Sequence, residues 1–371
     1  MIGKNVDVVI VGAGIAGCVV ALHLASAGRT VLIIEQAREV ARMGPDFVKP
    51  RGVETLKRLG LLDELMLRGA IKRSVIRYFH DGDPIIDYDL ETHSSTGYYL
   101  IVPYGTLLKV VMERLASMQG VEIWFGATAT ELNLTADGRA QVVLADGRSR
   151  TSSVVIGADG TNSRVREMSG IGATRQSYEQ VMHLATLPLV PSVAQCNRLY
   201  LSSQRRAAYF YPIGTDQMRV TSVGPSTERA LFQSELGWAV RQLRQFVSES
   251  DDVLAAMQES IAFQTVPLGR MHAIAYHRAN VALVGNSLLE VHPMTGQGMS
   301  LAFEDATSLS SHLESFFRGQ MSLDAALTCY SDERRPINTA MLEYSDRLYH
   351  SFENRERYLS VFDPRAHGDL H

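Results

Sequence analysis

The feature that most constrains this chain is the glycine turn at residues 12–17 (GAGIAG), which separates two apolar segments of different kinds. Residues 6–11 (VDVVIV) form the short Val- and Ile-rich run that is typical of a buried parallel strand. Residues 15–27 are rich in Ala and Leu and stop before Gly28, which predicts a helix with a glycine C-cap. A second buried strand is predicted at 30–35 (TVLIIE), so the chain begins with a βαβ unit.

The spacing of the three glycines indicates a dinucleotide site. Gly12 permits the tight turn, Gly14 lets a pyrophosphate approach the backbone, and Gly17 lets helix and strand pack closely. The helix N-terminus offers N–H groups and a positive dipole to the phosphates. Glu35 ends the second strand, where an acid can accept hydrogen bonds from ribose hydroxyls. The alternative is a tightly packed turn without a ligand, and the motif alone does not separate FAD from NAD.

Composition narrows the class of protein. The 371 residues can form two or three units around a large core, and a net charge of −4 lacks the basic footprint expected of a nucleic-acid-binding protein. The three cysteines are far apart and form no CxxC or Cys/His cluster, so we expect neither a disulfide framework nor a metal site. The apolar segment 6–28 is broken early by its glycines, which favours a strand, a turn and a helix over a transmembrane segment. A cytoplasmic location is expected.

Further along the chain, helical and extended patterns alternate. Helices are predicted at 52–70 with a break at Gly60, 105–118, 228–258, 298–318 and across most of 323–360. Strands are predicted at 75–90 around the turn at 81–83, at 180–225 with a turn at 211–214, at 261–266 and at 281–285. The segments VEIWF, TATELNL, AQVVLA and SSVVIGADG, within residues 121–160, predict a β-meander because Gly-containing turns separate them.

These patterns predict a mixed α/β chain with two interleaved domains. A Rossmann-like nucleotide-binding domain is expected from residues 1–73, 99–176 and 267–371, including the C-terminal helices. A β-sheet substrate domain is expected from the inserted segments 74–98 and 177–266.

Two more glycine-containing motifs follow buried strands. The first is GADGTNSRVR at 157–166, which could also be only a turn in which Asp159 or Ser163 caps the next helix. The second is VALVGNSLLEVHPMTGQGM at 281–299, in which a glycine bend precedes a helix that begins near Met299. A helix N-terminus at that bend would suit a developing negative charge better than a neutral ligand. The alternative is a glycine loop before an ordinary helix.

In this order the three motifs resemble those of the class A flavoprotein monooxygenases, the family of para-hydroxybenzoate hydroxylase, over essentially the whole chain. The resemblance implies a glutathione-reductase-type FAD domain and NAD(P)H as the electron donor. In the family, reduced FAD reacts with O2 to give a C4a-hydroperoxide whose terminal oxygen attacks an electron-rich ring or amine. The expected FAD contacts are Gly12, Ala13, Gly14, Ile15, Ala16, Gly17, Glu35, Gln36, Arg42, Lys49, Ala129, Asp159, Asn286, Pro293, Gly296, Gln297, Gly298 and Met299.

The sequence departs from the family pattern at two places. Residues 285–289 read GNSLL where the family usually has Gly-Asp-Ala-Ala-His, so Asn286 lacks the charge of the usual ribityl-binding Asp. Tyr104 occupies the position where many members have an FAD-contacting Arg. We therefore expect weaker FAD retention, with Arg42 and Lys49 as compensating cations.

These departures keep three alternatives open. The enzyme could bind flavin loosely and take reduced flavin from a flavin reductase, it could be a phenol hydroxylase, or it could be a flavin-binding protein that has lost oxygenation. Tryptophan halogenation is disfavoured because the two tryptophans, Trp124 and Trp238, do not form a Trp-x-Trp motif. A plain NAD dehydrogenase would not need the second and third motifs.

Within the family, residues 97–103, 197–214 and 358–363 resemble the branch that N-hydroxylates aminobenzoyl compounds in the bacterial alkylquinolone pathway. This implies an aromatic amine or quinolone as the substrate, in secondary metabolism. Tyr209 and Tyr211 share one strand face, so they either face the flavin and substrate, together with Pro293, or simply pack. His292 is a weak catalytic candidate because its ordinary pKa is near neutrality, although a structural role is the simpler interpretation. The sequence identifies no general base.

Overall fold

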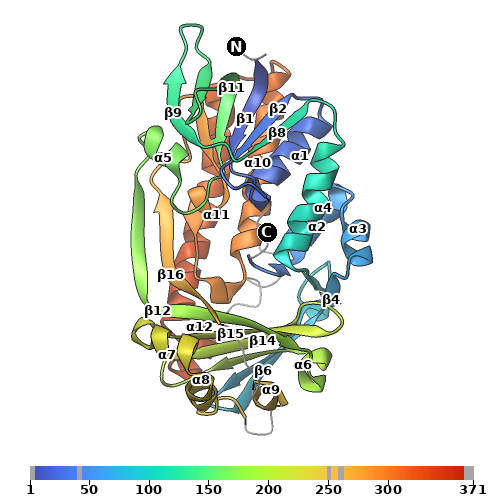
Figure 1. Ribbon diagram of the computed structural model, residues 1–371, viewed down its shortest axis with the longest axis vertical. Coiled ribbons are helices and arrows are strands. Elements are labelled where there is room, and N and C mark those ends of the chain that lie inside the picture. The colour runs from blue at the N-terminus through green and yellow to red at the C-terminus, as the bar shows by residue number, and fades with distance from the viewer. Residues whose placement is uncertain (1–4, 40–43, 249–251, 258–262, 363–371) are drawn as a thin grey trace.

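The computed structural model describes residues 5–39, 44–248, 252–257 and 263–362. Figure 1 shows two sheets at opposite ends of an elongated molecule, with helices grouped beside the first sheet and beyond the second. The long strand β12 (Ala173–Pro188) and the long helix α11 (Leu323–Tyr349) run along the molecule between these ends. The two ends are therefore connected by continuous elements as well as by loops.

The first sheet has the order β17-β18-β11-β1-β2-β8, and its central strands are parallel. Both faces of β1 and β2 are covered by other elements, which explains why these strands read as continuous apolar runs. A hairpin of β9 and β10 extends from β11. The strand bounds are β1 (Val6–Val11), β2 (Val31–Glu35), β8 (Val121–Phe125), β9 (Ala129–Leu134), β10 (Ala140–Leu144), β11 (Ser149–Gly157), β17 (His277–Arg278) and β18 (Val281–Leu283).

The predicted meander is correct for β9, β10 and β11 but wrong for the segment 121–125. That segment is β8, which pairs in parallel with β2 at the far side of the sheet, with Val121 opposite Val31. Helix α4 (Tyr104–Ala116) leads directly into β8 and makes the crossover that a parallel pair requires. Strand patterns report an extended backbone but not which neighbour it pairs with.

Helices α1 (Ile15–Ser26) and α10 (Gly298–Phe317) pack against each other beside the first sheet (Figure 1). Almost all of α1 is buried, which explains its lack of a polar face. The predicted helix at 52–70 is two helices, because Gly60 has a φ of +65° and ends the first. The remaining helices here are α2 (Pro50–Arg58), α3 (Leu62–Leu67) and α5 (Arg164–Met168). Helix α12 (Arg355–Val361) lies beside the second sheet, where Tyr358 contacts Tyr78 of that sheet. None of the described helices combines the length and apolarity needed to cross a membrane.

The second sheet has the order β19-β16-β12-β15-β14-β13-β5-β6. One face packs on a separate apolar cluster that includes Tyr200, Phe210 and Phe232, and the small helices α7, α8 and α9 cover that side (Figure 1). The strand bounds are β5 (Val75–His80), β6 (Asp83–Asp89), β13 (Asn197–Leu201), β14 (Ala207–Pro212), β15 (Gln217–Pro225), β16 (Gln264–Ala273) and β19 (Leu289–Glu290). The helices are α6 (Pro191–Gln195), α7 (Arg229–Ser234), α8 (Leu236–Leu243) and α9 (Asp252–Ala256).

A small third sheet, β3-β7-β4, lies between these units and consists of β3 (Phe47–Val48), β4 (Ile71–Arg73) and β7 (Tyr99–Ile101). The strands of the second sheet come mainly from the segments expected for the substrate domain, although β12 already begins at Ala173. The division into two domains at the expected residues remains our proposal.

Candidate functional site

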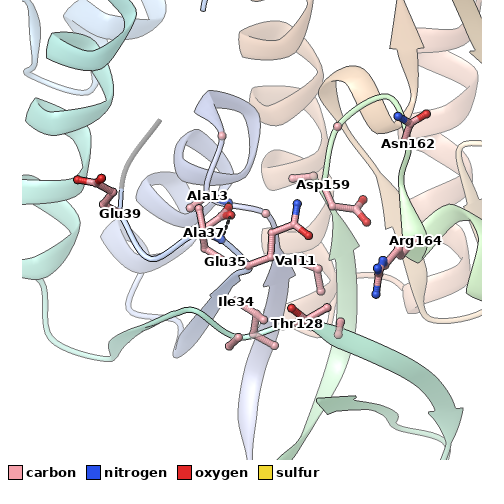
Figure 2. Close-up of a pocket in the computed structure, with 17 residues that line it drawn as sticks. Val11, Ala13, Ile34, Glu35, Ala37, Glu39, Thr128, Asp159, Asn162 and Arg164 are labelled. Atoms are coloured by element: carbon pink, nitrogen blue, oxygen red, sulfur yellow. Dashed lines mark hydrogen bonds between the residues drawn. The ribbon is translucent and has the colours of Figure 1, made fainter. Parts of the chain in front are cut away.

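Two cavities meet at the start of helix α1. The first has a volume of about 280 Å³ and lies beyond the carboxyl ends of β1, β2 and β11 (Figure 2). The second, of about 510 Å³, extends from α1 to the second sheet. Gly14, Ala158 and Gly160 line both cavities, so a long ligand could pass from one to the other around the glycine turn.

The three glycines of the turn have different surroundings. Gly12 has a φ of +105°, and a Cβ atom there would lie 2.3 Å from the carbonyl oxygen of Ala158. A Cβ atom on Gly17 would lie 2.4 Å from the carbonyl oxygen of Gly12, so this glycine serves close packing and lines neither cavity. At Gly14 the nearest heavy atom, the Tyr104 hydroxyl oxygen, would be 3.7 Å away. The open approach to the backbone is therefore at the second glycine, as the motif requires.

Glu35 lies beside the turn at the first cavity. Its carboxylate accepts hydrogen bonds of 2.8 Å from the backbone N–H groups of Ala13 and Ala37 (Figure 2). Two expected contacts, Gln36 and Ala129, also line this cavity. A carboxylate held in this way can accept hydrogen bonds from the hydroxyl groups of a ribose.

Asp159 faces the first cavity from the opposite side, next to Asn162 and Arg164 (Figure 2). Its carboxylate accepts hydrogen bonds from the Ser163 hydroxyl and, at 3.1 Å, from the backbone N–H of Val165. Ser163 is the N-cap of α5. The turn that caps α5 is therefore also a wall of the first cavity.

Some lining residues were missed by the sequence analysis. Thr128, Asn162 and Arg164 line the first cavity. Arg164 could have been predicted, because it follows Ser163 within the second motif. Arg166 is buried and donates to the carbonyl oxygens of Ser287, at 2.6 Å, and Thr161, at 2.8 Å. It therefore joins the second motif to the third, a contact that residue spacing does not reveal.

The third motif forms one wall of the second cavity. Residues Pro293–Thr295 make a short turn, Gly296 follows with a φ of +64°, and α10 begins at Gly298. Asn286 is exposed to this cavity, whereas Leu289 packs in the core and does not line it. The expected contacts that line the second cavity are Gly14, Ile15, Ala16, Lys49, Asn286, Pro293, Gly296, Gly298 and Met299. Gln297 lines neither cavity, and Arg42 is outside the described residues.

Tyr104 contacts the glycine turn directly. Its hydroxyl accepts a hydrogen bond of 3.2 Å from the backbone N–H of Ile15, the first residue of α1. Burial raises the pKa of this tyrosine to about 12, so the hydroxyl stays neutral. The side chain at this position therefore brings no positive charge to the N-terminus of α1.

Lys49 brings a cation to the second cavity. The side chain is buried and lines the cavity close to Gly296. Burial lowers the pKa of its amine to about 7. Near neutral pH this group therefore exists in both charge states, and a bound anion would favour the charged one.

Aromatic side chains form the wall of the second cavity on the side of the second sheet. Tyr209 and Tyr211 line it and both contact Phe47, while Phe210 points into the opposite apolar cluster, as strand alternation predicts. The Asn197 amide donates to the Tyr209 hydroxyl at 3.0 Å. The Tyr211 hydroxyl donates to Asp46 at 3.2 Å. Burial raises the pKa of both tyrosines well above 10, so they act as hydrogen-bond donors and not as bases.

His292 lies next to the third motif but does not line the second cavity. Its ring packs against Tyr178, Tyr349 and Phe352, and its Nδ1 accepts a 3.3 Å hydrogen bond from the backbone N–H of Met294. Burial lowers its pKa to about 3, so the imidazole is neutral. These contacts describe a structural histidine, and the catalytic interpretation finds no support in its position.

The residues present fit an extended dinucleotide. The fit rests on three observations: the open backbone at Gly14, the fixed carboxylate of Glu35, and the second cavity that continues from the turn towards the start of α10. No group of three or more His, Cys, Asp or Glu side chains in the described ranges is arranged to hold a metal ion.

The sequence matches a family model described as FAD binding domain over residues 5–345. Curated relatives include 3-demethoxyubiquinol 3-hydroxylase from Escherichia coli, which is 25% identical over 95% of this chain and 92% of the relative. Another relative, 3-amino-4-hydroxybenzoate 2-monooxygenase from Streptomyces cremeus, is 27% identical over 83% of this chain and 79% of its own length.

Among solved structures, PqsL from Pseudomonas aeruginosa is described as a probable FAD-dependent monooxygenase. It matches with a TM-score of 0.92 and 35% identity, over 97% of this chain and all of that chain. A second PqsL structure, in complex with 2-aminobenzoylacetate, matches with the same TM-score at 36% identity.

Proposed function

This chain belongs to the FAD-binding-domain family of aromatic monooxygenases, and on that premise we propose that its substrate is an aromatic amine of the 2-aminobenzoyl type. The enzyme is an FAD-dependent monooxygenase, and NAD(P)H is the electron donor that is typical of its family. These matches confirm the expected family, the mixed α/β fold and the FAD cofactor. The substrate, the site residues and any partner protein are our proposals.

The full-length likeness to PqsL, which has been crystallised with 2-aminobenzoylacetate, carries the substrate proposal. The shape and lining of the second cavity support it. Tyr209, Tyr211 and Phe47 offer flat faces for an aromatic ring, and Met182 and Val266 add apolar surface on the outer side. Stacking and apolar contact would hold the ring, and they would exclude water from the place of reaction.

We assign the two cavities different parts of the reaction. The first, with Glu35 and Asp159, would hold the ADP part of FAD. The second, with Asn286 and the turn at Gly296, would hold the flavin part together with the substrate. When bound, FAD supplies the redox chemistry that transfers one oxygen atom from O2 to the substrate.

The polar groups of the aromatic wall favour an amine. The Tyr209 hydroxyl accepts a hydrogen bond from Asn197, so its own proton is available to the carbonyl or carboxylate of a substrate. The Asp46 carboxylate already accepts hydrogen bonds from Arg219 and Tyr211, so it is engaged with the protein and not with the substrate. A neutral aromatic amine has a nucleophilic lone pair and needs no proton removed before it reacts, whereas a phenol often does.

A phenol hydroxylase is the second candidate, and one observation favours it. Lys49 has a pKa of about 7 in the cavity, so its neutral amine could take the proton of a phenol. The two candidates differ in the substrate that they turn over.

Delivery of reduced flavin by a separate flavin reductase is a further proposal. Asn286 and Tyr104 remove one negative and one positive charge from the places where the family binds FAD, which would weaken retention of the oxidised cofactor. A reductase would then supply the electrons in place of direct reduction by NAD(P)H.

The decisive experiment measures FAD binding and product formation with one preparation. The purified protein is titrated with FAD and followed by flavin fluorescence, and it is then assayed with 2-aminobenzoylacetate, aniline derivatives and matched phenols. Each assay is run with NAD(P)H alone and with NAD(P)H plus a flavin reductase. An N-hydroxylated product from the amines and none from the phenols supports the proposal. Turnover of phenols alone would contradict it, and failure to bind FAD in either assay would remove its basis.

A further inference from the structure

Four side chains form one row across the second sheet where that sheet faces the second cavity. Leu184 on β12 is paired with Thr221 on β15, and Thr221 is paired on its other side with Tyr209 on β14. Tyr209 is in turn paired with Leu199 on β13. All four residues line the cavity, as expected of side chains that share one face of a sheet. The row therefore places Thr221 between an aliphatic and an aromatic side chain.

The hydroxyl proton of Thr221 is already used within the protein. The side chain is only 4% exposed, and its Oγ1 donates a hydrogen bond of 3.2 Å to the backbone carbonyl oxygen of Tyr209. A hydroxyl group has one proton and two acceptor lone pairs. Thr221 therefore offers a ligand in the cavity a hydrogen-bond acceptor and no donor.

Tyr209 has the opposite polarity. Its hydroxyl accepts a hydrogen bond of 3.0 Å from the amide of Asn197, a fully buried residue of β13, so its own proton is left for a ligand. Strands β13 and β15 flank β14 in the sheet. The donor near β13 and the acceptor on β15 are thus separated by up to about 10 Å, which is two strand spacings. An aromatic ring with a polar group at each end has dimensions of this order.

An aromatic amine is matched to this arrangement. Its nitrogen carries N–H donors and one lone pair, and the lone pair is the nucleophile when oxygen is transferred to nitrogen. A wall group that donated a hydrogen bond would occupy this lone pair. A wall group that only accepts binds an N–H instead, and it leaves the lone pair free on the side of the cavity.

We propose that Thr221 binds the substrate amine by accepting a hydrogen bond from its N–H, and that it thereby selects rings that carry such a donor. The inference deepens the proposed function and rests on it, because the substrate ring must lie against this wall of the second cavity. Tyr209 donates to the acyl oxygen at the other end of the substrate. The two residues together fix the direction in which the substrate lies.

The test removes the hydroxyl of Thr221 and the amine of the ligand separately. Wild type, Thr221→Val, Thr221→Ser and Thr174→Val, each loaded with FAD, are titrated with 2-aminoacetophenone and with acetophenone, which lacks the amine. Binding is followed by the change in flavin absorbance. Thr174 is the matched control, because its hydroxyl also donates to a carbonyl oxygen of the neighbouring strand, that of His272 at 3.3 Å, but lies outside both cavities. The ratio of the two dissociation constants measures how strongly each protein recognises the amine.

Wild type is expected to bind 2-aminoacetophenone more tightly than acetophenone. Thr221→Val should lower this preference by about two- to tenfold, the range for one lost hydrogen bond, and should leave the affinity for acetophenone unchanged. Thr221→Ser keeps the hydroxyl and should keep most of the preference, and Thr174→Val should equal wild type. In product assays with the amine, Thr221→Val should have a higher KM and a lower kcat, because the amine loses its orientation.

Three results would overturn the inference. In the first, Thr221→Val and wild type have the same ratio. In the second, Thr221→Val weakens both ligands by the same factor, which would give Thr221 a packing role only. In the third, Thr221→Ser loses the preference as fully as Thr221→Val, which would assign it to the methyl group. Any of these in a wild type that oxygenates aromatic amines rejects this inference alone, whereas a wild type that oxygenates no aromatic amine rejects the proposed function with it.

Discussion

Arg219 Nε lies 2.9 Å from Asp46 Oδ2, although the two residues are 173 positions apart. Asp46 belongs to the loop that leads into β3, and Arg219 is on β15 of the second sheet. Their side chains are only 2% and 11% exposed, and Tyr211 donates to the same carboxylate oxygen. This pair joins β15 to the loop that leads into β3, and Asp46 and Phe47 of that segment also line the second cavity.

Breaking this pair is expected to destabilise the protein. Arg219→Met leaves the carboxylate of Asp46 buried without its cation, which should lower the free energy of unfolding by about 3–5 kcal/mol. Asp46→Asn combined with Arg219→Met should cost clearly less than the sum of the two single changes. Urea unfolding followed by circular dichroism measures these values. Arg77→Met, which breaks the exposed pair with Asp87, is the control and should cost less than about 1 kcal/mol. Equal losses at both sites would contradict a structural role for the buried pair.

Asn286→Asp is expected to tighten binding of oxidised FAD. The side chain is exposed to the second cavity, and a carboxylate would form charge-assisted hydrogen bonds with the hydroxyls of the ribityl chain. We expect the dissociation constant to fall by about three- to tenfold, measured by flavin fluorescence. Asn133→Asp on the exposed side of β9 introduces the same charge far from either cavity and should change nothing. An Asn286→Asp protein that held FAD no better than the parent would reject this account.

Tyr209→Phe is expected to impair substrate binding. It removes the hydroxyl that Asn197 orients, and a single hydrogen bond is worth about 0.5–1.5 kcal/mol, so KM should rise by about two- to tenfold. Steady-state assays with 2-aminobenzoylacetate give KM and kcat separately. Tyr98→Phe removes a hydroxyl outside both cavities and serves as the control. A KM that does not change in Tyr209→Phe would leave the tyrosine with a packing role only.

His292 is expected to make the fold sensitive to acid. Its folded-state pKa of about 3 is below its ordinary value of 6.5, so between these values the unfolded chain binds more protons than the folded chain. The contribution of this histidine to the free energy of unfolding is therefore complete above pH 6.5 and is lost as the pH falls towards 3, up to a total on the order of 5 kcal/mol. His292→Asn keeps an acceptor for the N–H of Met294 but does not titrate.

The measurement compares unfolding free energies of wild type and His292→Asn from pH 7 to pH 4. The variant should be less stable at pH 7 because the aromatic contacts are reduced, but its stability should fall less steeply with acid. His93→Asn at an exposed position should keep the slope of wild type. Parallel profiles for wild type and His292→Asn would show that the histidine is not buried in the neutral form.

Lys49→Met is expected to stabilise the folded protein. The pKa of Lys49 is lowered from 10.5 to about 7, so the buried amine opposes folding below its unfolded-state pKa, and stability rises as the pH increases from 7 to 10.5. An apolar chain of similar size removes this cost and should raise the free energy of unfolding at pH 7 by about 1–3 kcal/mol. Thermal unfolding of the FAD-free protein tests this. Lys72→Met, at an exposed position on β4, is the control, and its melting temperature should equal that of wild type. A lower melting temperature for Lys49→Met would mean that the lysine stabilises its own loop.

The amino-acid sequence determined the parts of this protein that depend on local backbone requirements. The turn at 12–17 needs a residue with positive φ at Gly12 and no side chain at Gly17, so its composition predicts its geometry. Tyr209 and Tyr211 share a face because side chains alternate along a strand, whatever the strand pairs with. The order of three such motifs was enough to predict the fold, the family and the cofactor.

Only the tertiary structure decided which faces meet. The residues at 121–125 read as a strand, but only the fold pairs them with β2 instead of β9. Arg166 donates to the carbonyl oxygen of Ser287, 121 positions away, and Lys49 lies beside Gly296. No repeating pattern of residues in the sequence predicts either contact. The physical reason is that hydrophobic periodicity reports which side of an element is buried. The identity of the group across that buried face, and hence the partner of each buried charge, depends on how distant elements pack.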